Sequence, residues 1–126
     1  MDPTPNSLYS LVGGEAWFAA LVERFYAGVV TDVVLAPLYP DDLTDSKAHM
    51  TGFLVQYWGG PQTYSEERGH PRLRMRHAAF GIDESVRDAW VRHMAASVRA
   101  GGLEPEVEEQ VLAYFDNAAT HLINRP

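Results

Sequence analysis

The stretch EAWFAALVERFYAGV, residues 15–29, decides the fold class. Its apolar residues recur at spacings of three and four, which places them on one face of a helix. These residues are Trp17, Phe18, Leu21, Val22, Phe25, Tyr26 and Val29. The face is wide, as expected for a helix that packs against a core. The pattern therefore predicts a strong amphipathic helix that begins at Glu15.

Helical patterns continue on both sides of this stretch, separated by glycine and proline breaks. Before it, Ser7 can cap a short helix over residues 8–12, which Gly13 and Gly14 end. After it, Asp32 can cap a short turn that ends before Pro37.

Three longer helices are expected in the rest of the chain. Their ranges are 45–58, 83–100 with Asp83 as the cap, and 105–122 with Pro105 in the first turn. No segment shows the alternation typical of a strand. We therefore expect an all-α fold.

Length and composition limit the possible classes of protein. A chain of 126 residues fits a single domain, residues 1–126. The absence of cysteine excludes disulfides and thiolate chemistry. A net charge of −7 argues against nonspecific nucleic-acid binding. The N-terminal residues lack a secretory pattern, and no apolar run reaches the length of about 20 residues that spans a bilayer. We expect a cytoplasmic protein with no membrane span.

The segment GHPRLRMRHAAF, residues 69–80, is basic although the chain is acidic. It lies within residues 62–82, where periodicity is weak and only a short helix over residues 72–77 is expected. A segment of this length needs something to pack against, and a bound ligand could supply it. The local charge indicates either a solvated loop or an anionic partner. Composition alone favours the solvated loop.

His77 stands out among the five histidines because of its neighbours. Each histidine taken alone is more often structural than a ligand. No H-E-x-x-H zinc motif and no G-x-S-x-G elbow is present. His77, however, lies between arginines and the apolar residues 78–80. Haem is a flat apolar group with two carboxylates and takes a proximal histidine in oxygen-binding proteins. A haem bound at His77 would use both the arginines and the apolar residues beside it.

Tyr26, Tyr39 and Trp90 support this hypothesis. Tyr26 and Trp90 lie on the apolar faces of their helices, and Tyr39 lies in a corner between two prolines. Such residues, when buried, usually pair their polar ends with backbone carbonyls. If all three point into one cavity, their N–H and O–H donors would suit a bound dioxygen.

The chain resembles a truncated haemoglobin of group II, the O type of the globin superfamily. The matching residues are Gly13-Gly14, RFYAGV (24–29), LYP (38–40), QYWGGPQTYSEERGHPRLRMRHAAF (56–80) and RDAW (87–90). They cover nearly the whole chain in order. The resemblance implies a truncated globin fold, a two-over-two helical sandwich that encloses haem b.

The resemblance also implies roles for particular residues. His77 would be the proximal iron ligand, and Tyr26, Tyr39 and Trp90 would be the distal polar residues. Ser46 falls where many globins have a distal histidine. The residues expected near the haem propionates are Arg74, Arg76, His49 and Tyr64, and those expected along the apolar part of the pocket are Met50, Phe53 and Leu73.

The leading hypothesis is reversible binding of O2, the basis of oxygen transport, and of other diatomic ligands at a pentacoordinate ferrous haem. A redox enzyme that uses the same haem for NO dioxygenation or peroxide reduction is a close alternative. A haem-free helical module that binds an acidic partner is an alternative of a different class. The sequence leaves open whether the protein is an enzyme, which reductase serves it, and whether it forms a homo-oligomer.

Overall fold

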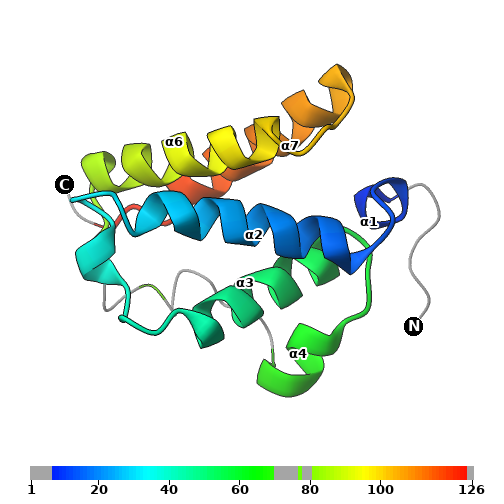
Figure 1. The fold of residues 1–126 in the computed structure, drawn as a ribbon, viewed down its shortest axis with the longest axis horizontal. Helices are drawn as coiled ribbons and strands as arrows, with labels where there is room; N and C mark the ends of the chain where they lie inside the picture. Colours follow the sequence, from blue (N-terminus) through cyan, green and yellow to red (C-terminus); the bar gives the residue numbers. More distant parts are fainter. Residues whose placement is uncertain (1–6, 70–76, 78–80, 125–126) are drawn as a thin grey trace. The chain divides into compact units, whose positions relative to one another are not determined.

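The structure is a computed structural model that describes residues 7–69, 77 and 81–124 (Figure 1). All regular elements in this part of the chain are helical. They are α1 (Leu8–Leu11), α2 (Glu15–Val29), the 3-10 helix η1 (Ala36–Leu38), α3 (Thr44–Tyr57), α4 (Thr63–Arg68), α6 (Glu84–Arg99) and α7 (Pro105–His121). The prediction of an all-α fold is confirmed.

The helix ends follow the capping residues in the sequence. The Ser7 hydroxyl accepts a hydrogen bond from the Ser10 N–H at 3.2 Å and so begins α1. The Asp83 carboxylate does the same for the Val86 N–H at 3.0 Å and begins α6. Pro105 begins α7, where its missing N–H costs no helical hydrogen bond.

Two elements differ from the expectation. Helix α4 was not predicted, because its six residues are mostly polar and only Tyr64 is buried. The turn after Asp32 was expected to end before Pro37, but η1 includes that proline. Pro37 lies in the first turn of η1, where a fixed φ and a missing N–H are tolerated. The short helix expected over residues 72–77 lies outside the described residues, apart from His77 in a turn.

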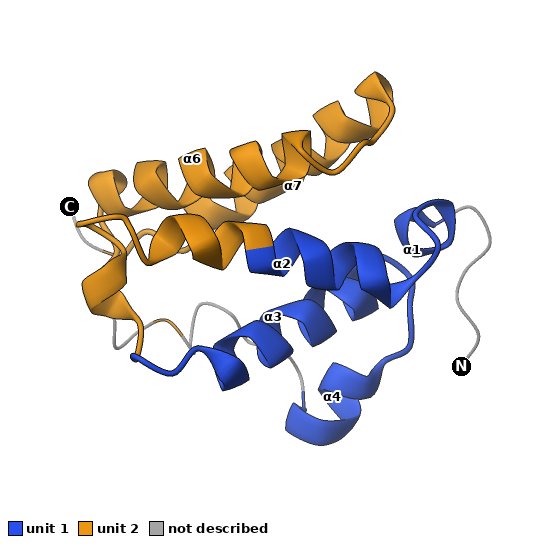
Figure 2. Cartoon of the chain, viewed as in Figure 1, with its two compact units in different colours: residues 1–23, 41–71 blue, residues 24–40, 72–126 orange. Residues whose placement is uncertain are grey.

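The chain forms two compact units (Figure 2). The first unit comprises residues 1–23 and 41–71, and the second comprises residues 24–40 and 72–126. The boundary falls within α2, between Glu23 and Arg24. The expectation of one domain over residues 1–126 stays a prediction.

An aromatic stack fixes the start of the first unit. The Phe18 ring lies 6.3 Å from the Tyr9 ring and 6.2 Å from the Trp58 ring, nearly parallel to both. The Tyr9 N–H also donates to the Trp58 carbonyl at 3.0 Å. A β-carbon at Gly60 would lie 2.6 Å from Val55 and 2.7 Å from Tyr9. Only glycine therefore lets the chain after α3 approach α1 so closely.

The core of the second unit lies between α6 and α7, which pack side by side (Figure 1). Met94 and Val98 of α6 and Val111 and Phe115 of α7 are buried there. The Arg24 guanidinium, on the second half of α2, donates twice to the Ser97 carbonyl, at 3.1 and 2.9 Å. Among the described helices, none is long and apolar enough to cross a membrane.

Candidate functional site

Tyr26, Tyr39 and Trp90 meet in the second unit and are called here the Tyr–Trp cluster. Tyr26 lies on α2 and is 4% exposed. Its ring stands perpendicular to that of Tyr39, with the centroids 5.5 Å apart. The Trp90 indole of α6 lies beside the Tyr39 hydroxyl. An indole nitrogen can only donate a hydrogen bond, whereas a phenol can donate and accept.

Both phenols of the cluster keep their protons over the whole physiological pH range. Burial raises the pKa of Tyr39 to about 12, although the neighbouring Trp90 side chain acts in the opposite direction. Burial raises the pKa of Tyr26 well above its usual value, and the nearby Tyr39 adds to this. The cluster is therefore a set of neutral hydrogen-bond donors.

Aromatic neighbours hold Trp90 in place. Its ring lies 5.1 Å from the Phe25 ring of α2 and 5.8 Å from the Phe115 ring of α7. Both phenylalanines are buried. The indole N–H is thus a polar group fixed within an apolar environment, where a hydrogen bond has a larger electrostatic effect than in water.

Asp32 fixes the loop that carries Tyr39. Its Oδ1 accepts from the Val34 N–H at 2.8 Å and the Leu35 N–H at 3.2 Å. Its Oδ2 lies 2.7 Å from His93 Nε2 and 3.1 Å from Arg92 Nη2, both of α6. These bonds, led by the one to His93, lower the pKa of Asp32 to about 2. The carboxylate therefore ties the loop to α6.

His93 reaches Asp32 because residue 28 is a glycine. A β-carbon on Gly28 would lie 2.4 Å from His93 Nδ1, which no real contact allows. Asp32 was expected from the sequence only as a turn cap, and His93 only as one histidine among five. Their contact joins residues 61 positions apart, so no local pattern could have indicated it.

His77 lies in a turn and is half-buried. Its carbonyl oxygen accepts a hydrogen bond from Asn124 Nδ2 at 3.2 Å. Asn124 follows the end of α7 and was not singled out from the sequence. Leu73, Arg74 and Arg76, three further residues expected at the site, lie outside the described residues.

The remaining candidate residues belong to the first unit. Helix α3 carries Ser46, Met50 and Phe53, all half-buried, at spacings that place them on one side. Phe53 contacts the buried Tyr64 ring of α4, with centroids 5.7 Å apart and the rings tilted by 70°.

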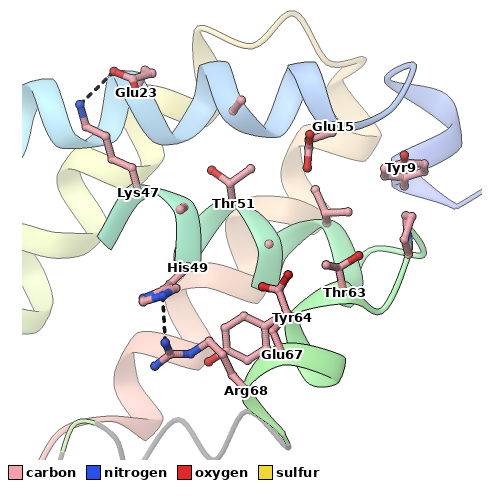
Figure 3. Close-up of a pocket in the computed structure, with 15 residues that line it drawn as sticks. Tyr9, Glu15, Glu23, Lys47, His49, Thr51, Thr63, Tyr64, Glu67 and Arg68 are labelled. Carbon is pink, nitrogen blue, oxygen red and sulfur yellow. Dashed lines mark hydrogen bonds and ion pairs between the residues drawn. The ribbon is translucent and has the colours of Figure 1, made fainter. Parts of the chain in front are cut away.

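Arg68 joins two of the residues expected near propionates. Its Nη1 donates to His49 Nε2 at 2.8 Å, and its guanidinium carbon lies 5.7 Å from the centre of the Tyr64 ring. Figure 3 shows both side chains beside Arg68. Arg68 directly precedes the basic segment, residues 69–80, and was not among the residues expected to bind a ligand.

A groove of about 670 Å³ lies next to these side chains in the first unit (Figure 3). Its walls carry both signs of charge, and the Lys47 Nζ and Glu23 Oε2 atoms in them form an ion pair at 3.1 Å. Ser46, Met50 and Phe53 do not line it, because residues on another side of α3 do. The groove and the Tyr–Trp cluster are thus built from different residues.

The donor set fits a haem better than a bare metal ion. Among the described residues, no group of three or more His, Cys, Asp or Glu side chains could hold a metal ion. A haem needs only one protein ligand for its iron, and the imidazole of His77 is the candidate for that bond. The neutral donors and aromatic rings of the Tyr–Trp cluster have the chemistry of a polar site inside an apolar pocket.

Comparison with known proteins shows the family. The sequence profile described as "Bacterial-like globin" matches residues 7–124. This chain belongs to that globin family. The Group 2 truncated hemoglobin YjbI of Bacillus subtilis (strain 168) is 38% identical over 125 residues, which covers 99% of this chain and 94% of that protein. The chain is accordingly a group II truncated haemoglobin, and the resemblance inferred from its motifs is confirmed.

Solved structures show the same fold. A thermostable hemoglobin from the actinobacterium Thermobifida fusca has a TM-score of 0.92 and 47% identity, covering 95% of this chain and 98% of its own. A truncated oxygen-avid haemoglobin from Bacillus subtilis has a TM-score of 0.88 and 39% identity, covering 94% and 100%. The truncated globin fold is confirmed, and membership of this family supports ligand binding at a haem.

Proposed function

We propose that this chain binds O2 and other diatomic ligands at a pentacoordinate ferrous haem b. His77 is the proximal ligand, and the Tyr–Trp cluster contacts the bound ligand. The observation that carries the proposal is that Tyr26, Tyr39 and Trp90 meet in one cluster, with the Tyr26 and Tyr39 rings 5.5 Å apart and the Trp90 indole beside the Tyr39 hydroxyl. When bound, the haem supplies an iron that coordinates the diatomic ligand reversibly.

The residues of the cluster would act as donors arranged in advance. The Trp90 indole N–H and the Tyr39 hydroxyl lie close together, so both could donate to the same bound ligand. Phe25 and Phe115 pack against the indole ring. Donors that need no rearrangement favour a ligand that carries partial negative charge.

The other candidate residues would hold the haem itself. Leu73, Met50 and Phe53 would contact its apolar part, and Arg74, Arg76, His49 and Tyr64 would lie near the propionates. Ser46 would leave the distal side without a histidine gate. Arg68 supports this proposal, because its contacts with His49 and Tyr64 add a cation to the same group of side chains.

We expect slow release of O2, because the donor bonds must break before the ligand leaves. The Bacillus subtilis relative described as oxygen-avid is consistent with this expectation. Continued O2 binding also requires a reductase that returns ferric iron to the ferrous state.

An absorption spectrum of the purified protein tests the proposal first. We expect a Soret band that His77→Ala abolishes or weakens through haem loss. His121→Ala, a change at an exposed histidine at the end of α7, should leave the band unchanged. A folded, colourless protein that hemin cannot reconstitute would favour the haem-free module. A Soret band unaffected by His77→Ala would show that another residue holds the iron.

Stopped-flow kinetics then test the reaction. Rates of O2 dissociation, NO dioxygenation and peroxide reduction should be measured on one preparation. Slow O2 dissociation without rapid peroxide or NO turnover supports ligand binding as the function. Rapid turnover would instead make the protein a redox enzyme.

A further inference from the structure

Asn124 connects the end of α7 to the segment that contains His77. Its backbone N–H donates to the Ile82 carbonyl at 2.8 Å, and its Oδ1 accepts from the Ile82 N–H at 2.8 Å. Its Nδ2 donates to the His77 carbonyl at 3.2 Å. One residue thus binds two points of the chain that lie five positions apart.

The oxygen and the nitrogen of the Asn124 side-chain amide bind different residues. The oxygen, together with the backbone N–H, pairs Asn124 with Ile82, which is buried just before the cap of α6. This pairing fixes where the start of α6 meets the end of α7. The amide nitrogen is the donor half, and it alone reaches His77 in this set of bonds. A carboxylate of the same shape would keep the first function and lose the second.

We propose that Asn124 is a positioning residue for His77. The inference rests on the proposed function, in which His77 holds the haem iron. A bond to the His77 carbonyl restricts rotation of the following peptide plane and so limits the directions in which the imidazole can point. Groups that orient a metal-binding histidine raise metal affinity because the ligand needs less reordering on binding. Asn124 achieves this through the backbone of the ligand residue.

The test compares Asn124→Asp with Asn117→Asp. The first keeps an acceptor for the Ile82 N–H and replaces the donor to His77 by a charged oxygen. The second places the same charge on an exposed position of α7 and serves as the matched control. For each haem-loaded protein, haem transfer to an excess of apomyoglobin and the iron–histidine vibration in the resonance Raman spectrum of the ferrous form are measured.

We expect Asn124→Asp to speed haem loss by about two- to ten-fold, the range for one lost hydrogen bond. The iron–histidine band should shift or broaden, and Asn117→Asp should match the wild type in both measurements. Asn124→Ala, which removes both side-chain bonds without adding charge, should change the band in the same way.

Several results would overturn the inference. If haem binds but the Asn124→Asp band and rate of haem loss equal those of Asn117→Asp, Asn124 does not position His77. The same follows if thermal stability falls and the band stays fixed, because the role is then structural. A wild type without haem would instead overturn the proposed function.

If the Asn124 variants do not fold, a structure of the wild type tests the inference instead. A crystal structure of the haem-loaded protein with Nδ2 on the His77 carbonyl and the His77 ring on iron supports the inference. The absence of either contact overturns it.

Discussion

The Tyr–Trp cluster and His77 belong to the same unit, but their supports differ in kind. Tyr26 and Trp90 lie on helices of 15 and 16 residues, α2 and α6. Trp90 is flanked by two aromatic rings, and the loop that carries Tyr39 is tied to α6 through Asp32. His77 lies in a turn, and its carbonyl accepts a hydrogen bond from Asn124, 47 positions away.

This difference separates geometry held within long packed helices from geometry in a turn that a contact from a distant part of the chain helps to hold. The donors of the cluster are held by buried neighbours, so replacing one donor should change ligand kinetics and leave the fold intact. The imidazole of His77 should respond to changes far from it in the sequence.

The largest expected effect comes from removing the Trp90 donor. Trp90→Phe keeps an apolar ring between Phe25 and Phe115 but cannot donate a hydrogen bond. A donor bond to a charged acceptor contributes about 1.5–3 kcal/mol, so O2 release should become roughly ten- to a hundred-fold faster. Stopped-flow O2 dissociation measures this effect.

CO serves as the control for the Trp90 variant. Bound CO is a poorer hydrogen-bond acceptor, so its release should change less than that of O2. If O2 dissociation from Trp90→Phe stays within about two-fold of wild type, the Tyr–Trp cluster does not control the rate of O2 release.

The second prediction tests the contact between α6 and α2 at the point where His93 lies against Gly28. In Gly28→Ala the new methyl group would lie 2.4 Å from His93 Nδ1, so the ring must move away from Asp32. We expect a loss of about 1–3 kcal/mol in the free energy of unfolding, measured by urea titration.

Gly52→Ala is the matched control for Gly28→Ala. It is also a glycine within a helix, but its β-carbon would meet Tyr64 at an ordinary 3.7 Å. We expect this change to be neutral or to stabilise the protein by about 0.5–1 kcal/mol. Equal effects of the two changes would show that His93 is not confined by Gly28.

The sequence predicted the helices well where a cap and an apolar stripe coincide. The helices that begin at Ser7, Asp83 and Pro105 start within a residue of their expected positions. Helix α4 was missed because six mostly polar residues carry no usable periodicity. Local chemistry was therefore sufficient for long elements and insufficient for a short one.

The residues of the candidate site were predictable in part. Tyr26 and Trp90 lie on apolar helix faces, a local property that the spacing reveals. The bonds of Asp32 to His93 and of Asn124 to His77 join positions 61 and 47 residues apart. Such contacts exist only after the helices pack, so a single sequence carries no signal for them.

A third, smaller effect is expected for Tyr39→Phe. The variant keeps the ring that stands against Tyr26 and removes the Tyr39 hydroxyl, which lies beside the Trp90 indole. Loss of one neutral hydrogen bond corresponds to about two- to ten-fold faster O2 release. If Tyr39→Phe exceeds Trp90→Phe in the same stopped-flow assay, Tyr39 is the main donor and Trp90 its support.

The smallest expected effect concerns the tie between the Tyr39 loop and α6, and it depends on pH. Because its bonds to His93 and the loop lower the pKa of Asp32 to about 2, its carboxylate stabilises the folded state above its ordinary pKa of about 4. This stabilisation should disappear as the pH falls from about 4 towards 2. Asp32→Asn keeps a cap oxygen for Val34 and Leu35 but loses the charge that His93 and Arg92 contact. The unfolding free energies of wild type and variant should therefore differ at neutral pH and converge in acid.

Asp42→Asn is the control for the effect on O2 dissociation. Asp42 is a cap residue in the first unit, and its pKa is also lowered. Asp42→Asn should leave O2 dissociation unchanged, whereas Asp32→Asn should speed it slightly by loosening the Tyr39 loop. Equal O2 dissociation rates for the two variants would mean that the ion pair stabilises the fold without holding Tyr39 in place.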